Sequence, residues 1–271
     1  MRLVEYYLQT ELFEDDLYKD TMNIIKEECS DIIDLYKKTN SFIYRGLKRT
    51  DNKKAIVRNV YKITPRTDRS PKDTSWDDQE IIDGYFYKKF GWKPRSEGVF
   101  TSQTYSVAGS YGDVGIFLPV NGYKYLWSKK YGDLYSDFFE DLVREYDPLD
   151  FEGKWVDEHG EEYDGYYDVE GYLNHTFKGN DTIQVTVKGD DYPKKVKKVI
   201  LKYNPSVTMD NFEKELEKKY KHAVNEYQDN DLNAFMKNRP SEAMFKCKYY
   251  YWIKWKGFNP ADIGINKNEI K

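Results

Sequence analysis

The chain has 271 residues, with 43 basic and 47 acidic side chains and a formal net charge of −4. This near balance argues against a protein whose affinity depends on wrapping duplex DNA, because such binding needs a strong excess of cations. Aromatic residues make up 17% of the chain, including 26 Tyr and 14 Phe. Since aromatic side chains favour the half-buried surface of a sheet, the composition predicts substantial sheet and argues against a four-helix bundle.

The cysteines and the apolar residues indicate neither an exported nor a membrane protein. Cys29 and Cys247 are far apart, and no Cys-x-x-Cys pair occurs, so no disulfide framework or zinc ribbon is expected. Residues 1–14 contain three glutamates, which are foreign to a signal peptide, and no stretch is long and apolar enough to span a membrane. We expect a cytoplasmic protein with no membrane partner.

The first forty residues predict helix, because apolar side chains recur at steps of four, three and four along Ile25, Cys29, Ile32 and Tyr36. The pattern breaks at residues 39–41. A helix is expected at 77–90, and short strands are expected at 41–46, 98–102, 115–119 and 123–127.

The second half of the chain opens with an acidic segment. Residues 150–170 contain nine acidic side chains and one lysine without the ligand spacing of an EF-hand, so a solvated, mobile insertion is predicted. A hairpin with strands at 183–187 and 196–203 is expected next. A helix capped by Thr208 and a long final strand over 243–255 follow.

Common catalytic motifs are missing. The chain has no His-Glu-x-x-His, Gly-x-Ser-x-Gly or Walker sequence, so hydrolase and kinase activities have no support. The three histidines, His159, His175 and His222, share no spacing that would bind a metal, and no metal site is predicted.

Three short segments at the ends of predicted strands carry a resemblance. They are Tyr44-Arg45-Gly46, then Gly98-Val99-Phe100-Thr101-Ser102, and finally Ser241-Glu242-Ala243-Met244. In this order they resemble the Arg, Ser and Glu motifs of the cholera-toxin-like branch of the ADP-ribosyltransferase superfamily, in particular its phage and bacterial toxin types.

The resemblance implies an α+β fold, namely an ADP-ribosyltransferase-like split antiparallel β-sandwich with an N-terminal helical region. It implies one domain over residues 1–271. An acidic and hairpin insertion at about 150–206 would account for the 140 positions from Ser102 to Glu242, a longer gap than the family usually shows.

The resemblance further implies NAD as a substrate. Breaking the nicotinamide–ribose bond develops positive charge on the ribose, which a preorganised carboxylate stabilises. Glu242 would be that catalytic carboxylate, Ser102 would orient it, and Arg45 would hold the phosphate or ribose of NAD through its paired donors. Tyr105 or Tyr111 would stack on the nicotinamide. The expected NAD-binding residues are Arg45, Gly46, Ser102, Tyr105 and Tyr111.

The acceptor is expected to be a nucleic acid base, in RNA or DNA, more than a protein. Family members that modify protein arginine carry a second glutamate two positions before the catalytic one, where this chain has Pro240. One side of the predicted final strand would present cations and rings to a single-stranded substrate: Lys246, Lys248, Tyr250 and Trp252. The same alternation also describes an ordinary strand with an exposed lysine face and a buried aromatic face.

Cationic and polar residues also gather in the segments before the serine strand: Arg66, Arg69, Asp73, Thr74, Arg95 and Ser96. Loops that bind a dinucleotide phosphate or a nucleic-acid acceptor have this composition. Ordinary solvated loops have it too, and both interpretations stay open.

A transferase without a secretion signal would act inside the cell that makes it, as a toxin or in phage–host conflict, restrained by an inhibitory protein partner or by limited expression. Two non-catalytic classes remain. A phage structural protein would gain no thermal stability from NAD. An RNA-binding protein would ignore NAD and bind RNA with strong salt dependence.

Overall fold

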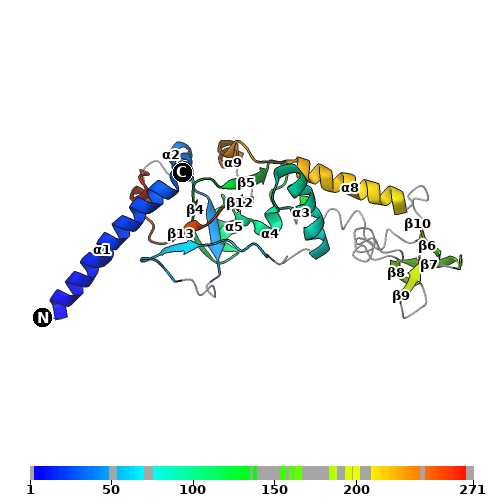
Figure 1. Ribbon diagram of the computed structural model, residues 1–271, viewed down its shortest axis with the longest axis horizontal. Coiled ribbons are helices and arrows are strands. Elements are labelled where there is room, and N and C mark those ends of the chain that lie inside the picture. Colours follow the sequence, from blue (N-terminus) through cyan, green and yellow to red (C-terminus); the bar gives the residue numbers. More distant parts are fainter. Residues whose placement is uncertain are drawn as a thin grey trace. The chain divides into compact units, whose positions relative to one another are not determined.

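The computed structural model describes residues 3–48, 54–69, 76–134, 137–138, 153–156, 159–160, 162–166, 183–187, 193–196, 198–201, 209–238 and 242–266. This part of the chain is mixed α+β, as the sequence predicts, and its paired strands are antiparallel. The chain divides into two compact units, which are described separately (Figure 1). Unit 1 consists of Met1–Arg69, Pro94–Gly132 and Tyr227–Lys271, and unit 2 consists of Ser70–Lys93 and Asp133–Glu226.

Unit 1 begins with the predicted N-terminal helices, α1 (Leu3–Glu28) and α2 (Ser30–Thr39). The predicted apolar stripe is completely buried at Ile25, Cys29, Ile32 and Tyr36. Helix α2 ends where Asn40 adopts a left-handed conformation with φ of 50°, which asparagine tolerates better than most residues. The predicted break at residues 39–41 is therefore confirmed.

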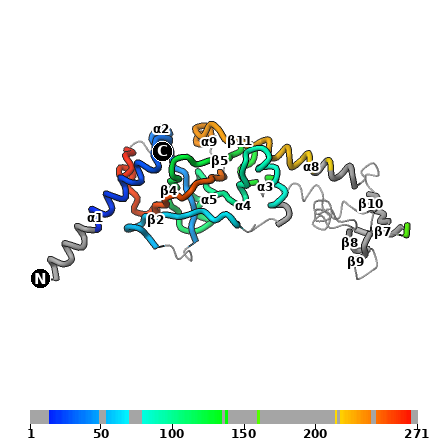
Figure 2. Tube along the Cα trace, viewed as in Figure 1, coloured from blue at the N-terminus to red at the C-terminus, as the bar shows by residue number. Residues whose placement is uncertain are grey.

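Two four-stranded sheets form the centre of unit 1. The first has the order β1-β4-β13-β2, from β1 (Tyr44–Leu47), β4 (Asp113–Pro119), β13 (Tyr250–Lys254) and β2 (Val60–Ile63). The second has the order β11-β5-β12-β3, from β11 (Tyr227–Gln228), β5 (Lys124–Ser128), β12 (Ala243–Lys246) and β3 (Val99–Thr101). Each sheet joins distant parts of the chain, and in the first sheet these are the blue, green and red segments of the trace (Figure 2).

The two sheets share one hydrophobic core. The ring of Phe117 on β4 lies 5.1 Å from the ring of Phe245 on β12 and 5.0 Å from that of Tyr250 on β13. Strands from both sheets therefore bury their aromatic residues against each other. Unit 1 is completed by α4 (Pro94–Glu97), α5 (Tyr105–Gly109), α9 (Leu232–Asn238) and the 3₁₀ helix η3 (Pro260–Ile263).

The prediction of one long strand over 243–255 is wrong, because this segment forms two strands in different sheets. Strand β12 ends at Lys246, and β13 begins at Tyr250 between β4 and β2. The first four residues of β13 are buried although they are consecutive. A strand that is buried on both faces reads as a continuous apolar run, so its sequence does not reveal where one strand stops and the next begins.

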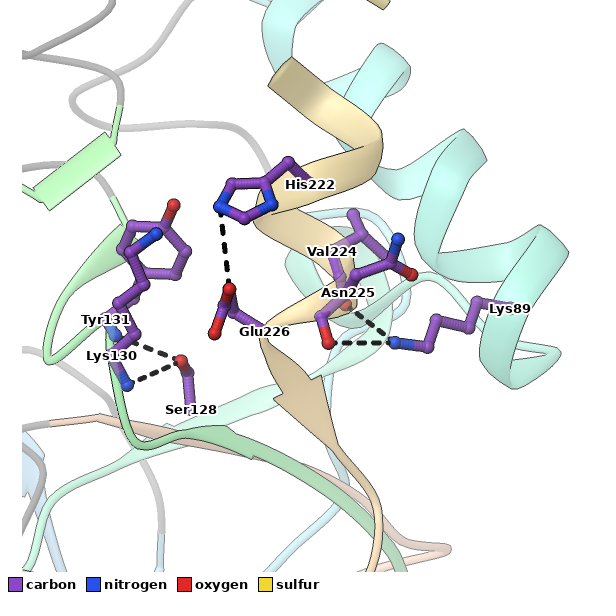
Figure 3. Close-up of polar contacts among 8 residues, drawn as sticks. All are labelled: Lys89, Ser128, Lys130, Tyr131, His222, Val224, Asn225 and Glu226. Carbon is purple, nitrogen blue, oxygen red and sulfur yellow. Dashed lines mark hydrogen bonds and ion pairs between the residues drawn. The ribbon is translucent and has the colours of Figure 1, made fainter. Parts of the chain in front are cut away.

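Unit 2 contains two of the predicted helices, α3 (Trp76–Phe90) and α8 (Met209–Asn225). Thr208, the predicted cap of α8, lies outside the described residues. The ring of Tyr85 on α3 stacks on that of Tyr220 on α8, with 6.1 Å between centroids. Lys89 donates to the main-chain carbonyls of Val224 and Asn225, where the end of the α8 dipole favours a cation (Figure 3).

The described strands of unit 2 form a five-stranded sheet with the order β10-β6-β7-β8-β9. They are β6 (Gly153–Val156), β7 (Glu162–Tyr166), β8 (Ile183–Val187), β9 (Pro193–Val196) and β10 (Lys198–Leu201). The predicted hairpin is present as β8 and β9, but its second strand starts at Pro193, and β10 pairs with β6 instead.

The acidic segment, predicted as a solvated insertion, contributes β6 and β7, which pair with each other. The charge composition did not reveal these strands, because strand pairing is made by backbone hydrogen bonds. The register places Lys154 opposite Asp164, and opposite charges at facing positions favour strand pairing.

Candidate active site

An isolated β-bridge joins the arginine strand to the serine strand. Strands β1 and β3 belong to different sheets, but Tyr44 and Ser102 form an antiparallel bridge. The main-chain N–H of Tyr44 donates to the carbonyl oxygen of Ser102 at 2.7 Å, and the main-chain N–H of Ser102 donates to the carbonyl oxygen of Tyr44 at 2.9 Å. The bridge therefore holds Arg45 next to Ser102 in space.

The register of β3 and β12 brings Glu242 to the same place. Ala243 pairs with Thr101, so the next pair outward along these antiparallel strands is Glu242 with Ser102. The Thr101 hydroxyl donates to the Ala243 carbonyl at 3.0 Å and fixes the end of the pairing. Glu242 is half-buried, and its Oε1 atom is fully buried. The three predicted catalytic residues thus meet where the two sheets are joined.

Arg45 is held by contacts from both sheets. Its Nη1 donates to the carbonyl oxygen of Phe100 at 2.6 Å, and its guanidinium carbon lies 5.6 Å from the centroid of the Tyr250 ring. The indole N–H of Trp252 donates to the Arg45 carbonyl at 2.8 Å and fixes the backbone. Within the described part of the chain, the buried Nε of Arg45 has no hydrogen-bond acceptor. Leaving a buried donor without an acceptor costs about 1–3 kcal/mol of stability. An oxygen of a bound phosphate would supply the missing acceptor.

Ser102 is 3% exposed, and its hydroxyl oxygen accepts a hydrogen bond from the main-chain N–H of Thr104 at 2.9 Å. A serine hydroxyl can accept and donate at once, so this contact leaves its hydrogen for a neighbouring carboxylate. The position of Ser102 opposite Glu242 is compatible with the predicted orienting role.

Gly46 lets helix α5 approach strand β1. A Cβ atom at Gly46 would lie 2.0 Å from the carbonyl oxygen of Ala108 and 2.8 Å from the Cβ of Tyr111. Tyr105 and Tyr111 expose 50% and 49% of their surface, and the ring of Tyr105 meets that of Tyr44 edge-on at 5.8 Å. Both predicted stacking residues therefore present ring surface close to the arginine strand.

Two more arginines reach the site from the segments before the serine strand. The guanidinium carbons of Arg69 and Arg95 lie 4.2 and 5.3 Å from the centroid of the Phe100 ring. The main-chain N–H of Arg69 donates to the Ser96 carbonyl at 3.3 Å and connects the two segments. Both side chains are half-buried, which decides against a fully solvated loop at these positions. Asp73 and Thr74, also singled out in the sequence, lie outside the described residues.

The arginines influence one another electrostatically. The pKa of Arg69 is lowered to about 10, mainly by burial and further by the positive charges of Arg45, Arg95 and Arg66. The carboxylate of Glu242 acts in the opposite direction and raises that pKa. Arg69 is therefore within electrostatic reach of the predicted clamp and of the predicted catalytic carboxylate.

The prediction that one side of the last strand presents cations and rings to a nucleic-acid substrate is wrong. Tyr250 and Trp252 are buried in the core of unit 1 and cannot stack on a base. Lys246 is exposed and pairs with Glu97 at 2.5 Å, and Lys248 is exposed in the turn after β12. The alternative interpretation, a buried aromatic face, is the one that the structure shows for these two rings.

The described histidines form no metal site. His222 lies on the exposed side of α8, with its Nε2 3.5 Å from a carboxylate oxygen of Glu226 (Figure 3). Among the residues that the structure describes, no group of three or more His, Cys, Asp or Glu side chains is placed to hold a metal ion. None of the described helices is both long enough and apolar enough to cross a membrane.

No family model, no curated protein and no solved structure matches the chain. The junction of the two sheets and the side chains gathered there are therefore the features from which a function can be inferred.

Proposed function

We propose that this chain is a mono-ADP-ribosyltransferase that uses NAD to modify an intracellular macromolecule. The supporting observation is the junction itself. Arg45, Ser102 and Glu242 are far apart in sequence, and the Tyr44–Ser102 bridge and the β3–β12 register bring them together. The resemblance implies this order of residues, and the two antiparallel sheets with preceding helices in unit 1 agree with the split β-sandwich that it also implies.

The proposed reaction breaks the bond between C1′ of the nicotinamide ribose and the ring nitrogen, and the electron pair leaves with neutral nicotinamide. The acceptor nucleophile bonds to C1′ and releases one proton. Glu242 holds the ribose 2′-hydroxyl and stabilises the positive charge that develops on the ribose. Arg45 binds a phosphate oxygen through donors that include its buried Nε. Ser102 orients the carboxylate of Glu242.

We favour a nucleic acid base as the acceptor over protein arginine. A guanidinium stays protonated at neutral pH and must lose a proton before it can attack, and Pro240 stands where the family's arginine-modifying members carry the extra glutamate. The exocyclic amine of a base needs no such deprotonation. Because Tyr250 and Trp252 are buried, stacking would fall to exposed rings such as Tyr105 and Tyr111.

The test is incubation of the protein with labelled NAD and separate pools of RNA, DNA and cell protein. Label is expected in nucleic acid, and Glu242→Gln should lower transfer by about a hundredfold or more while NAD still binds. Glu97→Gln is the matched control. It also removes a carboxylate, but one that pairs with Lys246 on β12 and has no role in the proposed reaction. This control is expected to keep its activity.

Near-normal transfer by Glu242→Gln would reject the catalytic assignment. Label found only in protein would reject the acceptor. Label in no pool, together with no thermal stabilisation by NAD, would favour a phage structural protein. Salt-sensitive RNA binding without any use of NAD would favour a non-catalytic RNA-binding protein.

The biological role that we propose for this activity is modification of macromolecules inside the cell that makes the protein. We propose a toxin or an agent of phage–host conflict, held in check by an inhibitory protein partner or by limited expression.

A further inference from the structure

Three guanidinium groups converge on Phe100. Arg45 donates to its carbonyl oxygen at 2.6 Å, and Arg69 and Arg95 lie 4.2 and 5.3 Å from the centroid of its ring. Both ring distances are within the range of about 6 Å in which an aromatic face attracts a cation. Phe100 therefore fixes two guanidinium groups close to each other.

The cluster lies on the same side of the serine strand as the candidate catalytic residues. Phe100 and Ser102 are two positions apart in an extended segment, so their side chains point to the same face. Glu242 is opposite Ser102 in the continued register of β3 and β12. The cations over the Phe100 ring are thus neighbours of the proposed reaction centre.

Bringing these cations together in half-buried positions has an electrostatic cost. Burial and the charges of Arg45 and Arg95 lower the pKa of Arg69 to about 10, because both disfavour another positive charge at this place, although the carboxylate of Glu242 acts in the opposite direction. A bound anion would offset the mutual repulsion. Guanidinium groups are also suited to phosphate, since each can give two parallel hydrogen bonds to its oxygens.

We infer that Arg69 and Arg95 form a phosphate-binding site next to Ser102 and Glu242, which takes a phosphate or diphosphate group of a nucleotide. The inference deepens the proposed function and rests on it for the identity of the nucleotide. The phosphate comes either from NAD or from the backbone of a nucleic-acid acceptor.

Inorganic pyrophosphate is the probe for the shared chemistry, titrated calorimetrically at low salt into the full chain. Arg69→Gln and Arg95→Gln are each expected to weaken its binding about tenfold or more, the loss of one charge-assisted contact. Arg58→Gln is the matched control, because Arg58 also lies over a ring, 5.5 Å from the centroid of Tyr18, and pairs with Asp15. The control should bind pyrophosphate like the wild type.

Unchanged binding by Arg69→Gln and Arg95→Gln, or an equal loss in Arg58→Gln, would overturn the inference. Circular dichroism melting checks that each variant folds. If Arg69→Gln does not fold, Arg69→Lys keeps the charge without the paired donors and should still bind pyrophosphate more weakly than the wild type.

Titrations with NAD and with a short single-stranded RNA distinguish the two sources. Weaker NAD binding in the two glutamine variants assigns the site to NAD, whereas weaker RNA binding with unchanged NAD binding assigns it to the acceptor. If both variants bind NAD and RNA as tightly as the wild type, the site does not bind a nucleotide.

If pyrophosphate binding depends on both arginines but no transfer from NAD occurs, the phosphate site stands and the proposed transferase fails. If transfer occurs and neither glutamine substitution changes pyrophosphate binding, only this inference fails.

Discussion

Arg45 combines a structural contact with a donor that is available to a ligand. Its Nη1 holds the Phe100 carbonyl of the neighbouring sheet, while its buried Nε has no acceptor within the described structure. Arg45→Lys keeps the positive charge but removes Nε and the fork of donors. We expect the affinity for NAD to fall about tenfold or more, with a smaller effect on kcat, because a clamp acts on ground and transition states alike. Binding titrations and steady-state kinetics measure the two effects, and an unchanged Kd would count against the clamp.

The residues of the site could be predicted only in part. Arg45, Ser102 and Glu242 are recognisable because each occurs in a short motif and the three follow a known order. Arg69 and Arg95 carry no motif, and their sequence context fits a solvated loop equally well. What distinguishes them is their common contact with the Phe100 ring, which forms only when the chain is folded.

At the scale of elements, Gly46 controls how closely α5 packs on β1. A Cβ atom there would lie 2.0 Å from the Ala108 carbonyl oxygen, a backbone atom that moves only with its helix. Gly46→Ala should therefore destabilise the protein by roughly 1–3 kcal/mol and displace the helix that begins with Tyr105. Chemical denaturation measures the stability, and NAD titration measures the effect on the site.

Gly84→Ala is the control for this prediction. A Cβ atom at Gly84, within helix α3, would meet nothing within 4 Å, and alanine favours helix by about 1 kcal/mol over glycine. This control should leave stability unchanged or raise it slightly. A Gly46→Ala protein with wild-type stability and wild-type NAD binding would show that α5 does not depend on the close approach.

The long helices were predictable, but the short helices α4, α5 and α9 and several strands were not, for a physical reason. Helices α2 and α8 are amphipathic, so their buried and exposed positions repeat in the sequence. Strand β2 has four residues and was not predicted, and β12 and β13 were predicted as one strand. A run of buried residues such as Tyr250 to Ile253 gives no period that distinguishes a central strand from its neighbours.

At the scale of the whole molecule, Glu28 ties the N-terminal helices to the last strand of unit 1. The hydroxyls of Tyr249 and Tyr251 donate to its two carboxylate oxygens at 2.8 and 2.5 Å. Burial by itself would raise the pKa of Glu28, but the hydrogen bonds from Tyr251 and Tyr249 and the charges of Lys62 and Lys248 lower it overall. The carboxylate therefore stabilises the fold above its ordinary pKa of 4.5, and this contribution is lost as the pH falls through the lower, folded-state pKa.

Glu28→Gln should consequently lower the Tm at pH 7, and the difference from the wild type should shrink as the pH falls below 4.5. Thermal melts followed by circular dichroism between about pH 3 and 7 measure the Tm of the variant and of the wild type over the pH range in which carboxylates titrate. Glu27→Gln is the control, because the neighbouring Glu27 is exposed, and its Tm at pH 7 should match the wild type. A difference in Tm that stays constant down to the lowest pH would mean that the charge of Glu28 is not responsible.

The proposed activity also predicts how the whole molecule behaves in a bacterium. An enzyme that turns over at about 1 s⁻¹, a modest rate, would modify roughly 3,600 acceptors in an hour, so a few copies suffice to damage a cell. Inducible expression of the wild type should therefore stop growth. Glu242→Gln should restore growth at an equal level of folded protein. Glu97→Gln should remain harmful, because the carboxylate that it removes pairs with Lys246 and has no role in the proposed reaction. Colony counts after induction, with expression checked in each strain, measure the effect. A folded wild type that binds NAD and leaves growth unchanged would contradict the role of a toxin, because a toxin that turns over at this rate should stop growth at high expression.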